Sequence, residues 1–119
     1  MKRTDADYLA AVQVAVDILR ERARQAQDIS YGDLSVGLRE RGFAGVRPHL
    51  GIMTYLLKDV CLHGNEDGRA PMLSVLVVNK TSRVPSEQFS VLARQPPFSR
   101  LGDWTWQEER RAVFAAFRD

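Results

Sequence analysis

The chain contains 119 residues, of which 45% are hydrophobic and 27% charged, and its formal net charge is +2. This length supports one hydrophobic core, so we expect a single domain spanning residues 1–119. No apolar run approaches the roughly 18 to 20 residues that cross a bilayer, and acids rather than apolar residues follow the start, so we expect neither a membrane partner nor a secretory signal. The one cysteine, Cys61, excludes an internal disulfide and is typical of the reducing cytoplasm, where we place the protein.

The positive charge is concentrated in the middle of the chain. Residues 39–100 carry nine Lys and Arg against five Asp and Glu, whereas residues 1–38 and 101–119 each have a net charge of −1. A basic stripe in the middle segment would attract phosphate groups. A solvated, arginine-rich surface is an equally simple interpretation.

The first predicted element is a long amphipathic helix over residues 5–26. Its apolar residues recur at steps of three and four: Tyr8, Leu9, Val12, Ala15, Val16, Leu19, Ala23 and Ala26. Val14 and Ile18 lie off this stripe. They either widen the face that packs on the core or form a homodimer contact.

A helix-turn-helix is predicted over residues 28–63. Ser30 followed by Asp33 is typical of a helix N-terminus, and Gly42 provides a left-handed stop. Pro48 suits the first turn of the next helix, which Gly64 ends. The inner side of that helix is expected at Leu50, Met53, Leu56, Leu57 and Val60.

A β-hairpin is predicted next. Residues 72–78 are an apolar run that indicates a covered strand, residues 79–86 resemble a hairpin loop, and residues 88–93 indicate the return strand. Helix, turn, helix and hairpin are the outline of a winged helix. The expected fold class is therefore α+β: a winged-helix-like helix-turn-helix with a β-hairpin wing, plus a long N-terminal helix and a C-terminal helix.

The C-terminal helix is predicted from a capping box at Thr105 and Glu108. Its apolar side, which we assign to the core, consists of Trp106, Val113, Phe114 and Phe117. Trp104 lies just before this helix, where an exposed indole would mark an interface.

The order Ile29-Ser30-Tyr31-Gly32-Asp33-Leu34, a helix containing Gly51 and a strand opening with Pro71 resembles the DNA-binding domain of alkylguanine-DNA alkyltransferases and alkyltransferase-like proteins. The resemblance covers roughly residues 28 to 90 and implies a winged helix that binds DNA. Met72 and Leu73 stand where that family has its nucleophilic cysteine and activating histidine. Because a thioether cannot be deprotonated, alkyl transfer is excluded, and we expect no catalytic residue and no enzyme activity.

Eight residues are predicted to contact nucleic acid, by groove contacts, phosphate contacts or a clamp from the wing tip. The alternative is an ordinary solvated surface, or for Tyr31 a half-buried aromatic side chain that packs at the helix start. His49 and His63 have no neighbours at metal-ligand spacing, so we expect no metal and no cofactor. The groove residues are Arg47, Thr54, Tyr55 and Lys58, the phosphate residues are Tyr31 and Arg39, and the wing-tip residues are Lys80 and Arg83.

The sequence therefore predicts a non-catalytic module that binds nucleic acid, with duplex DNA as the expected partner. The alternative is a protein-interaction adaptor of the immunity, antitoxin or anti-defence type with the same fold. Its contact face would be Val14 with Ile18, or the region of Trp104.

Overall fold

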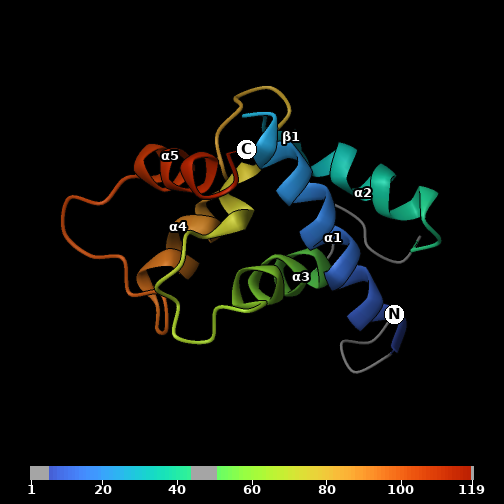
Figure 1. The fold of residues 1–119 in the computed structure, drawn as a ribbon, viewed down its shortest axis with the longest axis horizontal. Coiled ribbons are helices and arrows are strands. Elements are labelled where there is room, and N and C mark those ends of the chain that lie inside the picture. The colour runs from blue at the N-terminus through green and yellow to red at the C-terminus, as the bar shows by residue number, and fades with distance from the viewer. Residues whose placement is uncertain (1–5, 44–50, 119) are drawn as a thin grey trace.

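Helix α1 (Ala6–Arg24) runs through the middle of the molecule and packs against four other elements (Figure 1). The structure is a computed structural model that describes residues 6–43 and 51–118. The absence of Gly and Pro allows 19 helical residues. The residues of α1 that are buried recur at steps of three and four: Tyr8, Ala11, Val12, Ala15, Val16, Leu19 and Ala23.

Two residues of the expected apolar stripe, Leu9 and Ala26, do not lie on the buried side of α1. Leu9 is 61% exposed. Ala26 lies beyond the helix end, in an exposed turn. Val14 and Ile18 are partly buried and pack against the core, so of the two interpretations the structure supports the wider core face.

Helix α2 (Tyr31–Glu40) begins where the sequence predicted. The Ser30 hydroxyl accepts a hydrogen bond from the Asp33 N–H at 3.0 Å, which satisfies one of the free donors of the first turn. Gly42 follows the helix with φ +94°, a conformation that glycine adopts at no steric cost.

Helix α3 (Gly51–Leu62) has the expected inner side, with Met53, Leu56, Leu57 and Val60 buried. Gly64 follows it with φ +64°. The predicted start at Pro48 lies outside the described residues, as do Leu50, His49 and Arg47.

The predicted β-hairpin is wrong. Residues Leu73–Leu76 form a 3₁₀ helix, η1, and only Val77–Val78 extend into a strand, β2. Strand β2 pairs in parallel with β1 (Ile29–Ser30), with Ile29 opposite Val77 and Ser30 opposite Val78. The run from 72 to 78 is buried throughout because η1 packs against α1, α3 and α5.

The expected return strand is a helix, α4 (Glu87–Arg94). Phe89 and Ala93, four residues apart, are buried, and Leu92 is partly buried beside them, which is helical spacing. Val91, which a strand would have buried with Phe89, is 57% exposed. Residues 79–86 therefore join a strand to a helix, and the described chain contains no wing of paired strands.

Helix α5 (Trp106–Ala116) completes a mixed, helix-dominated fold around a small parallel sheet, which agrees with α+β in the broad sense. The Thr105 hydroxyl accepts from the Glu108 N–H at 3.3 Å, as the capping box predicted. Val113 is buried, and Trp106, Phe114 and Phe117 are partly buried against the core. No helix in the described ranges has the length and apolarity needed to span a membrane.

Candidate functional site: a groove between α3 and α4

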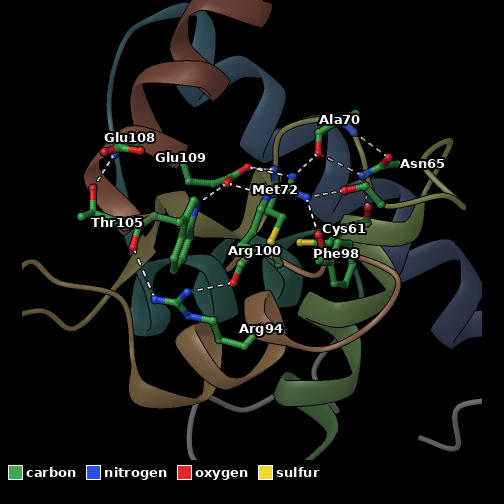
Figure 2. A network of polar contacts seen from close by, with 12 residues as sticks. Cys61, Asn65, Ala70, Met72, Arg94, Phe98, Arg100, Thr105, Glu108 and Glu109 are labelled. Atoms are coloured by element: carbon green, nitrogen blue, oxygen red, sulfur yellow. Dashed lines mark hydrogen bonds and ion pairs between the residues drawn. The ribbon is translucent and has the colours of Figure 1, made fainter. Parts of the chain in front are cut away.

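The most polar part of the interior surrounds Glu109 of α5 (Figure 2). Only 5% of Glu109 is exposed. Its carboxylate accepts hydrogen bonds from the Arg100 side chain at 3.0 and 3.2 Å, from the Trp104 indole at 2.7 Å and from the Met72 N–H at 2.8 Å. Burial alone would raise the pKa of Glu109, but the donors from Arg100, Met72 and Trp104 outweigh it and hold the pKa below its ordinary value.

Arg100 extends this network to the loops before η1 and α5. Its guanidinium donates to the carbonyls of Gly68 at 2.6 Å, Phe98 at 2.8 Å and Ala70 at 2.8 Å. Asn65 holds Ala70 from the other side, accepting from its N–H at 3.0 Å. The arrangement thus joins these two loops to each other and to α5 (Figure 2).

Cys61 lies near this network and is buried. Burial raises the pKa of its thiol to about 11, although a hydrogen-bonding contact with the Ser74 hydroxyl at 3.0 Å opposes the shift. The thiol is therefore protonated at neutral pH and is a poor nucleophile. Trp104 is engaged as well: it packs on Phe89 with ring centroids 6.1 Å apart, so it is not the exposed anchor that the sequence allowed.

A groove of about 900 Å³ lies between α3 and α4. Apolar side chains from both helices, including Met53, Leu57 and Phe89, lie along it. Tyr55 of α3 and Val91 of α4 also line it and remain 51% and 57% exposed. Large apolar side chains left exposed beside one groove are typical of a binding surface.

Four of the eight predicted contact residues line this groove: Tyr31, Thr54, Tyr55 and Lys58. Two of them have partners across it. The Tyr31 hydroxyl accepts from the Ser86 N–H at 3.2 Å, and the Thr54 hydroxyl donates to the Gln88 side chain at 2.7 Å. Both contacts help to fix α4 beside α3.

The other predicted contact residues are dispersed. Arg39 is exposed on α2, and Lys80 is exposed in the 79–86 loop. Arg83 forms an ion pair with Asp28 and lines a different hollow. Arg47 lies outside the described residues. Among the described residues, the charged side chains that line the groove are Lys58 and Glu87. Arg83 lines the other hollow, so it does not share one with Lys58.

Sequence reasoning missed the Glu109–Arg100 network and the α4 side of the groove. The signal for the network was present, because Glu109 falls between Trp106 and Val113 on the apolar side of its helix, where an unpaired acid would be costly. Within the described ranges, no three His, Cys, Asp or Glu side chains are grouped closely enough to hold a metal ion.

Comparisons with models of protein families, with curated proteins and with solved structures found no match. The resemblance to alkyltransferase-like domains stays a prediction.

Proposed function

We propose that the chain is a non-catalytic protein-interaction module that accepts an amphipathic helix of a partner protein in the α3–α4 groove. The observation that carries this proposal is the pair of exposed apolar side chains, Tyr55 and Val91, on facing helices above an apolar floor. A helix whose apolar residues recur at steps of three and four would cover both. Burying them in a complex would remove apolar surface from water and favour association.

The polar residues of the groove indicate the chemistry of that helix. Lys58 and Glu87 place opposite charges beside the apolar floor, and Gln88 and Gln95 add neutral donors and acceptors. A partner helix with one acid and one base flanking its apolar side would complement this pattern. A polyanion would meet Lys58 but also the acid Glu87.

The test is selection of binding peptides from a displayed library of amphipathic helices, followed by titration of the selected peptides. Tyr55→Ala and Val91→Ala should each weaken binding about tenfold, because truncating a central apolar anchor typically costs more than 1 kcal/mol. Leu9→Ala is the matched control, since Leu9 is similarly exposed but lies on α1, away from the groove. Peptides whose affinity is unchanged by both groove variants would overturn the proposal.

Nucleic acid is the second candidate, favoured by the convergence of Tyr31, Tyr55 and Lys58 on one groove. Aromatic side chains beside a cation suit stacked bases and phosphates, and the family resemblance implies duplex DNA. Lys80 is exposed in the adjoining loop, where it would contact the backbone.

A duplex-DNA titration at low and moderate salt separates the candidates. For a nucleic-acid module, affinity should fall steeply with salt, and Lys80→Glu should weaken it further. The same substitution should leave peptide binding unchanged, because Lys80 does not line the groove. Absence of DNA binding even at low salt would eliminate this candidate.

A further inference from the structure

A second hollow, of about 560 Å³, lies where the end of α1, the 79–86 loop and α5 meet. Figure 1 shows this loop rising beside β1 near the C-terminal end of α5. Three arginines from three distant segments line it: Arg22 of α1, Arg83 of the loop and Arg110 of α5. The remaining lining residues are Ala26, Gln27, Asp28 and Phe114. We call it the arginine hollow.

The charges of the arginine hollow are unbalanced. Three guanidinium groups face one carboxylate, that of Asp28, which leaves an excess of two positive charges. Asp28 also fixes two of the arginines, because its carboxylate pairs with Arg83 and its backbone carbonyl accepts from Arg22 at 3.0 Å. A concave surface lined by one sign of charge concentrates ions of the opposite sign.

Arg110 is the arginine of this hollow whose side chain has no hydrogen-bond or ion-pair partner among the residues that the structure describes. Its guanidinium lies over the Trp106 ring, 5.0 Å from the centroid. Stacking on the ring orients the planar group and leaves its N–H donors for another ligand.

The backbone of the arginine hollow is unusual at two positions. Ala26 and Arg83 have φ values of 52° and 57°, in the left-handed region that residues other than glycine rarely adopt. Hydrogen bonds hold the loop in this shape: the Arg83 N–H donates to Asn79 at 2.9 Å, and both the N–H and the side chain of Asn79 donate to Val84. Such conformations cost free energy and are concentrated at functional sites.

We propose that the arginine hollow binds a phosphate group in its dianionic form, as free phosphate or as a small phosphate monoester. Two excess positive charges match a dianion, and guanidinium groups donate paired hydrogen bonds to phosphate oxygens. The ligand would bind Arg110 directly and share Arg22 and Arg83 with Asp28. This site is separate from the α3–α4 groove and does not depend on the function proposed for it.

The test is calorimetric titration of the full chain with inorganic phosphate, methyl phosphate and dimethyl phosphate. The first two should bind and the third, a monoanion, should bind at least about tenfold more weakly. Binding of both inorganic phosphate and methyl phosphate would show that the site accepts a monoester as well as the free ion. Binding of inorganic phosphate without methyl phosphate would identify the free ion as the ligand. A diester that binds as tightly as the monoester would overturn the dianion assignment.

Two variants locate the site. Arg110→Gln should weaken phosphate binding about tenfold, because a charge-assisted hydrogen bond contributes more than a neutral one. Arg83→Gly should also weaken it while preserving the loop, since glycine adopts a positive φ without strain. The matched control is Arg111→Gln, on the same helix but outside the arginine hollow. No phosphate binding by the wild type, or binding that both hollow variants retain in full, would overturn the proposal.

Discussion

Glu109 is a buried acid whose ionised form supports the fold, because its carboxylate receives four hydrogen bonds. Its pKa is lowered from the ordinary 4.5 of a free glutamate. A carboxylate with a depressed pKa stabilises the folded state above the unfolded pKa and loses that contribution as the pH falls through the folded value. The fold should therefore be fully supported by Glu109 at neutral pH and should weaken below about pH 4.5.

The variant Glu109→Gln should lower the free energy of unfolding at pH 7 by about 3 kcal/mol, because it leaves the mostly buried Arg100 without its counter-charge. Its stability should also fall less than that of the wild type between pH 5 and pH 3. Urea denaturation across that pH range measures both effects. Glu108→Gln is the control, since Glu108 is exposed on the same helix; equal losses in the two variants would contradict a special role for Glu109.

Cys61 should be an unreactive thiol in the folded protein. With a pKa of about 11, about one thiol in a thousand is ionised at pH 8, and burial also blocks reagents. A chromogenic disulfide reagent at pH 8 should label the native chain at least about 100-fold more slowly than the chain in denaturant. Equal rates would show that the Cys61–Ser74 contact opens freely in solution.

At the scale of elements, two of the helices that the sequence predicted correctly, α2 and α5, carry both a cap and a helical stripe. Ser30 and Thr105 each accept the expected backbone hydrogen bond, at the start of α2 and α5. Helix α4 was misassigned because Phe89, Val91 and Ala93 also alternate as in a strand, and a segment of eight residues provides too few positions to separate the two periods. Tertiary packing separates them, since Leu92 is partly buried beside Phe89 and Ala93 while Val91 is exposed, a pattern that a helix produces and a strand does not.

The caps of α2 and α4 allow a matched comparison. Ser30 is buried and its hydroxyl bonds the Asp33 N–H, whereas Ser86 occupies the same position before α4 without a side-chain hydrogen bond. Ser30→Ala should therefore cost about 1 to 2 kcal/mol of unfolding free energy, because it leaves a first-turn donor unsatisfied. Ser86→Ala should cost less than about 0.5 kcal/mol. Thermal unfolding of both variants tests this, and a larger loss for Ser86→Ala would contradict the assigned caps.

At the scale of the molecule, the sequence located part of the candidate site but not its surroundings. Tyr55 and Lys58 were placed correctly on the outer side of α3, because the buried stripe determines which side remains. The partner side chains across the groove follow from the position of α4, which local patterns do not encode. In the same way, the pairing of Arg83 with Asp28 joins residues 55 apart, and it separates Arg83 from the groove that contains Lys58.

The contact between the 65–70 loop and the 95–100 loop tests this long-range packing directly. Gly68 has φ +72°, and a Cβ atom there would lie 2.5 Å from the Pro97 carbonyl oxygen and 2.8 Å from the Phe98 nitrogen. Arg100 holds the two loops together through the Gly68 and Phe98 carbonyls, so neither backbone can move aside without breaking its hydrogen bonds. Gly64 has a similar φ of +64° but nothing within 4 Å of the same position.

Gly64→Ala should therefore lose about 1 kcal/mol of unfolding free energy from the left-handed backbone alone. Gly68→Ala should lose about 3 kcal/mol, since the same backbone cost is joined by overpacking against a fixed main chain. Urea denaturation of the two variants gives the difference, in which the shared backbone term cancels. Equal losses of unfolding free energy in the two variants would mean that the two loops do not pack closely. The Arg100–Glu109 network would then not join these loops to α5.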